Sequence, residues 1–208
     1  MADIIFLLDE SYSMIHHYNL YIKGVNKFIT TQKSINPDAN FSMIKFNSQI
    51  TPICLNNKIN TLPEFTNSDY NPNGLTCLYD AIEYVFKIKS TKECKQVIVI
   101  ILTDGEDTCS KNTLQDISRK ISEVVSKGWV LVYIAANQNA QKIGHLLGIK
   151  ICVSYKETEK NIDHVADVCS IAIGHAMYKW SGIPNKFCLL EIPLDVSDIM
   201  NGIENFTI

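Results

Sequence analysis

Asp9, Ser11 and Ser13 alternate directly after the apolar run 4–8. One carboxylate and two hydroxyls are hard oxygen ligands, which suit Mg²⁺, Mn²⁺ or Ca²⁺ rather than zinc or copper. An uninterrupted apolar run of this length is typical of a strand that is buried on both faces in a parallel sheet. The stretch therefore predicts that the carboxyl end of the first strand forms half of a metal site.

Two further segments could supply the other half of this site. Asp104 follows the apolar run 97–102, and Thr76 immediately precedes a predicted helix. In an open α/β sheet, ligands bind beyond the carboxyl ends of the strands, near the point where the strand order switches. We therefore expect Asp104 to bring a second carboxylate and Thr76 a third hydroxyl, on tight turns that Gly74 and Gly105 allow.

Hydrophobic periodicity predicts the elements that must position these side chains. Their order predicts an α/β fold with a mostly parallel sheet and one antiparallel edge strand. Polar and apolar residues alternate in the predicted strand 41–46, so we expect this strand to be partly exposed. The predicted strands are 4–8, 41–46, 50–55, 97–102, 130–136 and 149–153, and the predicted helices are 20–33, 77–89, 114–127, 139–147 and 162–180.

The chain reads as one domain over residues 1–180, followed by a C-terminal extension, 181–208, whose structure the sequence does not define. Its 208 residues are enough to bury a substantial core without disulfides. The long polar connection 56–74 leads to Thr76, and loops of this length in a compact domain are often functional.

Charge and cysteine usage narrow the class of protein. A formal net charge of −3 gives no electrostatic case for binding nucleic acid or an anionic membrane. No two of the seven cysteines lie within four residues of each other, so there is no paired-cysteine zinc or redox motif. We expect reduced, mostly buried thiols in a cytoplasmic protein.

Three motifs together carry a family resemblance. Asp9-x-Ser11-x-Ser13, then Thr76 within Gly-x-Thr-x-Leu-x-Asp-Ala-Ile, then Thr103-Asp104-Gly105 resemble the metal-ion-dependent adhesion site of von Willebrand factor A domains, the I domains of integrins. The resemblance spans residue 3 to about residue 180. The stretches 74–82 and 128–138 further resemble small stand-alone A-domain proteins of bacteria and viruses. The resemblance to von Willebrand factor A domains implies a doubly wound, Rossmann-like sandwich with helices on both faces of the sheet.

The resemblance also implies a ligand set. Ser11, Ser13 and Thr76 would coordinate Mg²⁺ or Mn²⁺, which are expected ahead of Ca²⁺, while Asp9 and Asp104 would bind directly or through water. Where this chain has Tyr12, the family usually has a small residue, often glycine. That departure bears on what can approach the metal rather than on its ligands.

Hydroxyl ligands would leave the cation much of its charge and one open position, which would attract an Asp or Glu carboxylate of a partner protein. The leading hypothesis is a non-enzymatic, metal-dependent protein-binding module. One alternative is a Mg²⁺-dependent phosphohydrolase of the haloacid-dehalogenase type that uses Asp9. That chemistry needs a second aspartate where this chain has Ser11. Another alternative is an assembly subunit with a structural metal.

Several neighbours of the motifs have expected structural roles. Tyr12, Met14 and Tyr70 could form an apolar rim or pack under the long loop. Glu10 and Glu106 are expected at the rim of the site, Asp80 near a helix N-terminus, and His16 and His17 in a loop or at a helix start.

Overall fold

The computed structural model describes residues 2–89, 96–136 and 140–155, together with 166–167, 169–170 and 173–174. Within these residues, no helix is both long enough and apolar enough to cross a membrane. Strands and helices alternate along most of the chain, as the periodicity predicts. The elements are β1 (Asp3–Asp9), η1 (Tyr12–His17), α1 (Tyr18–Ile35), β2 (Asn40–Phe46), β3 (Ile50–Lys58), η2 (Ile59–Thr61), η3 (Asn67–Asp69), α2 (Leu78–Ile88), β4 (Val97–Thr103), α3 (Leu114–Ser126), β5 (Val130–Ala136), α4 (Ala140–Leu147) and β6 (Ile151–Tyr155).

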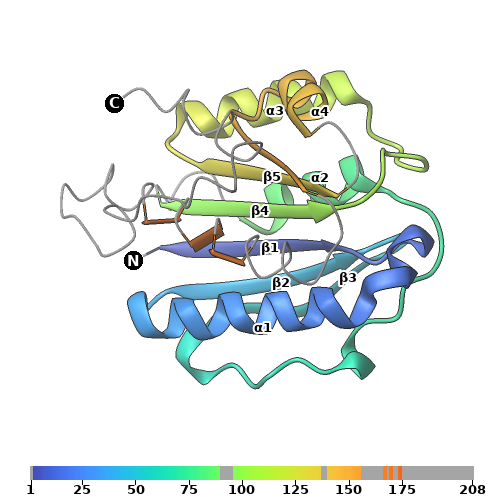
Figure 1. Cartoon of the computed structure of the whole chain (residues 1–208). Coiled ribbons are helices and arrows are strands. Elements are labelled where there is room, and N and C mark those ends of the chain that lie inside the picture. The colour runs from blue at the N-terminus through green and yellow to red at the C-terminus, as the bar shows by residue number, and fades with distance from the viewer. Residues whose placement is uncertain are drawn as a thin grey trace.

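The strands form one six-stranded sheet in the order β3-β2-β1-β4-β5-β6. Every neighbouring pair is parallel except β2 and β3, which are antiparallel. From β1 the chain builds outward to one edge and then returns to β4, which lies against the other side of β1 (Figure 1). The strand order therefore switches between β1 and β4, and a ligand site is expected beyond their carboxyl ends.

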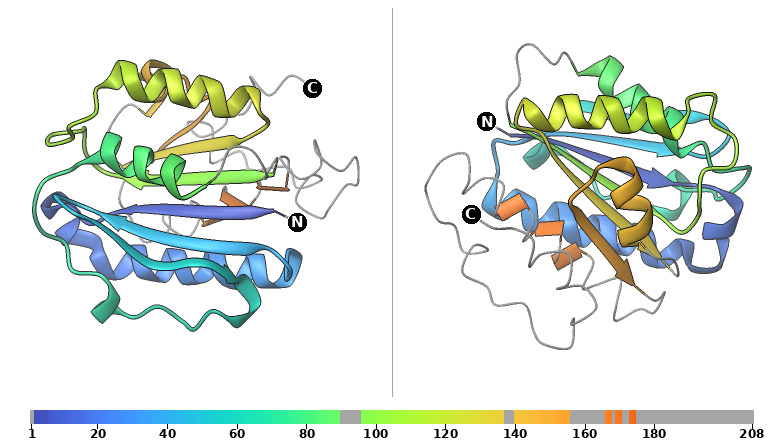
Figure 2. Two further views of the ribbon diagram at one scale, coloured as in Figure 1. Left: turned by 180° about the vertical axis from the view of Figure 1, so that it is seen from behind. Right: turned by 90° about the horizontal axis from the view of Figure 1, so that it is seen from above.

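Two hydrophobic cores cover the two faces of the sheet. Alternate residues of β1 enter each of them, because successive side chains of a strand point to opposite faces. Ile4, Phe6 and Leu8 pack with α1, whereas Ile5 and Leu7 pack with α2 and α3. Helices lie on both sides of the sheet, with α1 on one face and α2 and α3 on the other (Figure 2). This packing fixes the strand ends that carry the polar motifs.

The doubly wound α/β architecture and the antiparallel edge strand are confirmed. The expectation that strand 41–46 is partly exposed is wrong, because Phe41–Phe46 is buried throughout. Its polar members have partners inside the fold: Ser42 Oγ accepts a hydrogen bond from the backbone N–H of Asn56, and Lys45 forms an ion pair with Glu10. The predicted helix 162–180 lies largely outside the described residues, and the extension 181–208 does so entirely.

Candidate functional site

Asp9 is the last residue of β1, and its carboxylate is fully buried at the switch point. Thr103, at the end of β4, donates its hydroxyl to Asp9 Oδ2 over 2.5 Å. The backbone N–H of Ser11 donates to Asp9 Oδ1 over 2.8 Å. Burial raises the pKa of Asp9 to about 6 although these hydrogen bonds oppose the shift. Among the described residues, the groups that act on this carboxylate are Thr103, Ser11 and Asp104, none of which is a cation. A bound metal ion would supply a counter-charge.

A line of oxygen atoms leads from Ser11 across to Asp104. Ser11 Oγ lies 3.1 Å from Ser13 Oγ, and Ser13 Oγ donates to Asp104 Oδ1 over 2.6 Å. Asp104 lies in the turn after β4, where burial raises its pKa while the Ser13 hydrogen bond and the nearby His16 oppose that shift. The structure therefore brings together segments of the chain that are 91 residues apart in sequence.

Thr76 reaches the same place from the segment before α2. A Cβ atom built on Gly105 would lie 3.4 Å from Thr76 Oγ1 and 3.9 Å from Ser13 Oγ. These distances place both hydroxyls around the turn that carries Asp104. All five residues singled out in the sequence are thus gathered at this edge of the sheet: Asp9, Ser11, Ser13, Thr76 and Asp104.

The short helix η1 turns its side chains toward three different surroundings. Residues three apart eclipse each other in a 3₁₀ helix. Ser13 and His16 share the side that faces Asp104, and Met14 is fully buried in the core. Tyr12 is exposed. Of the two roles expected for these residues, a place at the rim of the site applies to Tyr12, and packing inside the fold applies to Met14.

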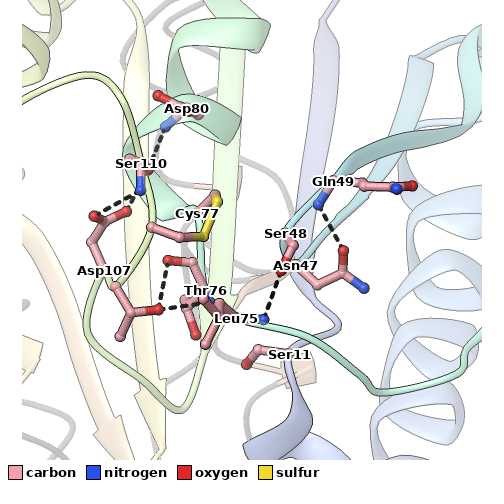
Figure 3. The surroundings of a disulfide bond; sticks show 12 residues. Ser11, Asn47, Ser48, Gln49, Leu75, Thr76, Cys77, Asp80, Asp107 and Ser110 are labelled. Carbon is pink, nitrogen blue, oxygen red and sulfur yellow. Dashed lines mark hydrogen bonds between the residues drawn. A yellow bond between two sulfur atoms is a disulfide. The ribbon is translucent and has the colours of Figure 1, made fainter.

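A second set of contacts joins the segment of Thr76 to the loop after β4. Thr108 Oγ1 accepts a hydrogen bond from the backbone N–H of Thr76, and the N–H of Thr108 donates to the carbonyl of Thr76. Nearby, the N–H of Tyr79 donates to Asp107 Oδ1, and the N–H of Asp80 donates to Ser110 Oγ (Figure 3). The loop is therefore attached to the first turn of α2 by backbone and side-chain bonds.

Asp80 completes this attachment from the helix side. Its carboxylate accepts hydrogen bonds from the backbone N–H groups of Lys111 and Asn112 and from the Asn112 side chain. Partial burial opposes ionisation, but these donors outweigh it and lower the pKa of Asp80. The expectation of a role near a helix N-terminus is confirmed.

A disulfide joins the same two segments covalently. Cys77 and Cys109 are bonded, with their Cα atoms 4.8 Å apart (Figure 3). The expectation that the thiols are reduced is therefore wrong for this pair. No local motif indicates this bond, because the two residues are 32 positions apart and become neighbours only through the loop attachment. Cys54, Cys152 and Cys169 are free, and Cys94 and Cys188 lie outside the described residues.

Glu10 lies inside the fold and not at the rim. Its carboxylate accepts from Lys45 Nζ over 2.7 Å and from the backbone N–H of Asn71 over 2.6 Å. Tyr70 is also buried, and its hydroxyl donates to the carbonyl of Asp9 over 2.6 Å. These bonds anchor the long loop to the end of β1. Glu106 is exposed, as expected.

In the donor set, neutral hydroxyls outnumber carboxylates. Within the described part of the chain, no three His, Cys, Asp or Glu side chains gather where they could hold a metal ion. The gathered set has two carboxylates and three hydroxyls, which are donors that suit a hard divalent cation. An ion that the hydroxyls bind directly, with a carboxylate bound through water, would keep much of its charge. These residues fit the metal that the resemblance implies.

Sequence reasoning missed the residues that support this set. Thr103 holds Asp9 and Thr108 holds Thr76 in place. The sequence assigned neither of them a role: Thr103 appeared only as part of the motif that carries Asp104, and Thr108 resembles an ordinary loop threonine. Thr103 offered the better signal, because it is the last residue of a central strand and directly precedes Asp104.

Comparison with known proteins identifies the class. The family model of the von Willebrand factor type A domain matches residues 3–166, and the chain belongs to this family. No curated protein sequence matches it significantly.

Solved structures share the fold at low sequence identity. Proximal thread matrix protein 1 from the mussel byssus is 16% identical with a TM-score of 0.62, over 83% of this chain and 48% of that one. BatB from Bacteroides thetaiotaomicron is 14% identical with a TM-score of 0.55, over 83% of this chain and 98% of that one. A von Willebrand factor type A protein from Catenulispora acidiphila is 11% identical with a TM-score of 0.59, over 83% of this chain and 43% of that one. The matched region spans about half the length of the byssus protein.

Proposed function

We propose that this domain is a non-enzymatic, metal-dependent protein-binding module. Asp9, Ser11, Ser13, Thr76 and Asp104 would hold Mg²⁺ or Mn²⁺, and an Asp or Glu carboxylate of a partner protein would take the open position of the ion. The observation that carries the proposal is the meeting of three hydroxyls and two carboxylates at the switch point of the sheet.

Simple electrostatics supports capture of a carboxylate. Two unit charges 4 Å apart interact by about 4 kcal/mol at an effective dielectric of 20, and a divalent ion about doubles that gross value. An exposed pair of Lys and Glu side chains contributes only about 0–1 kcal/mol. One carboxylate bound to the metal could therefore dominate a modest interface, provided that neutral hydroxyls leave the ion its charge.

The choice of metal follows from the donors. Oxygen ligands favour Mg²⁺ or Mn²⁺, with Ca²⁺ behind them because it usually takes six to eight oxygen ligands. One solved structure of the byssus protein is described as having a zinc-occupied MIDAS motif, where MIDAS stands for metal-ion-dependent adhesion site. That protein is 15% identical to this chain with a TM-score of 0.60, over 83% of this chain and 48% of that one. Zn²⁺ therefore belongs in any titration.

The metal part of the proposal is tested by titrating Mn²⁺ into wild type, Asp104→Ala and Glu106→Gln in a calorimeter. Wild type and Glu106→Gln should bind one ion with similar affinity, because Glu106 is an exposed carboxylate next to the site. Asp104→Ala should lose most of that affinity, because it removes one of two carboxylates. Identical titrations of wild type and Asp104→Ala would contradict the proposal.

Partner capture separates the competing functions. Binding of a partner in pull-downs should be lost in EDTA and restored by Mn²⁺. A partner that is fully retained in EDTA would favour the assembly subunit with a structural metal. Turnover of a phosphate ester that disappears in Asp9→Asn would favour the phosphohydrolase, although Ser11 stands where that chemistry needs an aspartate.

The cytoplasmic location expected from the sequence needs its own test. The Cys77–Cys109 bond is of the kind that persists mainly in oxidising compartments, whereas the free and buried Cys152 and Cys169 fit either location. Thiols can be alkylated during cell lysis and counted by mass spectrometry. Alkylated Cys77 and Cys109 would support the cytoplasm, and an intact bond would argue against it.

A further inference from the structure

Large apolar side chains are exposed beside the candidate site. Tyr12 exposes 64% of its surface, Leu75 57% and Ile15 38%. Within the described residues, only Leu55 and Leu146 are other large apolar side chains with comparable exposure. Single exposed apolar residues are ordinary, but three of these five lie within two residues of Ser13 or Thr76.

Helix η1 explains why two of them lie together. Tyr12 and Ile15 are three residues apart in a 3₁₀ helix, so their side chains share one side of it. Met14 fills the core and Ser13 faces Asp104. The apolar pair is therefore displayed beside the donor set by the same turn that positions Ser13.

Leu75 is held next to this pair by its backbone. The N–H of Tyr12 donates to the carbonyl of Gly74, and the N–H of Leu75 donates to Ser48 Oγ over 2.9 Å. Gly74 has φ +75°, a conformation that favours glycine, and a Cβ there would lie 2.8 Å from Ser48 Oγ. The segment is thus fixed with Leu75 exposed, and Figure 3 shows Leu75 beside Ser48 and Thr76.

We propose that Tyr12, Ile15 and Leu75, which we call the apolar shelf, select a partner whose metal-binding Asp or Glu is flanked by large apolar side chains. This inference rests on the proposed function and adds the chemistry of the partner to it. The shelf is continuous with the donor set, so a loop that places a carboxylate on the metal brings its neighbouring residues onto the shelf. Polar flanking residues would leave the shelf in water, whereas Leu, Ile, Phe or Met would bury it.

The test uses displayed peptides with a fixed central Asp or Glu, or with serine in its place, and randomised flanking residues, selected on the protein in Mn²⁺. Selected peptides are then measured by fluorescence anisotropy against wild type, against Tyr12→Ser combined with Leu75→Ser, and against Leu55→Ser combined with Leu146→Ser. The second pair is a matched control, because both leucines are exposed and lie in β3 and α4, away from the site. Mn²⁺ titration of each variant verifies that the metal site is unchanged.

We expect peptides with an acidic centre and large apolar flanks, binding that EDTA abolishes, and affinity reduced at least about tenfold only in the Tyr12 and Leu75 variant. Acidic peptides with polar flanks, or equal affinity for all three proteins, would overturn the shelf and leave metal-dependent capture standing. Apolar peptides that lack an acid and bind equally in EDTA, but not to the Tyr12 and Leu75 variant, would overturn carboxylate capture and leave the shelf as a binding surface. Selection of no peptide would overturn both.

Discussion

At the scale of single residues, Lys45 shows that a charge buried beside the sheet is paired with an opposite charge. It lies on β2 beside the end of β1, where its ammonium donates to Glu10 and to the carbonyl of Asp69. Both members of the ion pair are almost fully buried. Removing one partner of a buried pair leaves an uncompensated charge, which is far more costly than losing a surface pair.

We expect Lys45→Ala to lower the free energy of unfolding by about 3–5 kcal/mol. Lys127→Ala is the matched control, because Lys127 and Glu123 form an ion pair over the same 2.7 Å but are exposed. The control should change stability by about 0–1 kcal/mol. Urea unfolding followed by circular dichroism measures both, and equal effects would contradict the buried-charge argument.

The ligand candidates and Lys45 differ in how far the sequence could predict them. Asp9 stands directly after one apolar run and Asp104 one residue after another, so their position at strand ends followed from local pattern alone. The partnership of Lys45 with Glu10 depends on the register of two strands and on a loop that returns between them. For that reason Lys45 reads in the sequence as an exposed residue of a half-buried strand.

At the scale of elements, the disulfide and the hydrogen bonds around it attach the loop after β4 to α2 independently. The noncovalent bonds join Thr108, Asp107 and Ser110 to the start of α2 and do not involve the sulfur atoms. The disulfide constrains the unfolded chain in addition, because it closes a loop between residues 32 positions apart.

We therefore expect Cys77→Ala combined with Cys109→Ala to lower the free energy of unfolding by about 3–4 kcal/mol, the range the chain-entropy model gives for such a loop. Mn²⁺ affinity should stay close to that of wild type, because the hydrogen bonds keep Thr76 in place. Cys54→Ala, which removes a free thiol in β3, is the control. Loss of Mn²⁺ binding without loss of stability would mean that the disulfide itself positions Thr76.

The contact between α4 and β6 makes a second prediction at this scale. A Cβ on Gly144 would lie only 2.0 Å from Cys152 Sγ, so the helix packs on the strand through its glycine. Gly144→Ala should lower stability by about 1–3 kcal/mol, as overpacking does. Combining it with Cys152→Ala should recover much of that loss, and additive effects of the two changes in denaturant unfolding would contradict the close contact.

At the scale of the whole molecule, the sheet order is what turns scattered residues into one site. Only when β1 and β4 are neighbours do Asp9, Thr103 and Asp104 meet, and the loop before α2 then brings Thr76 to the same edge. The alternation of strands and helices predicted this architecture because apolar runs and helical stripes are local signals. Packing between distant segments creates the disulfide, the buried ion pair and the apolar shelf. Local sequence patterns therefore do not predict these three features.

The central claim is that these five residues hold a divalent cation, and a crystal structure grown in Mn²⁺ tests it most directly. We predict one anomalous peak among Asp9, Ser11, Ser13, Thr76 and Asp104. The hydroxyls should lie about 2.1 Å from the ion, and one position should be open to solvent or to a neighbouring carboxylate. Absence of a peak there at saturating Mn²⁺, or a peak only elsewhere on the molecule, would contradict the claim.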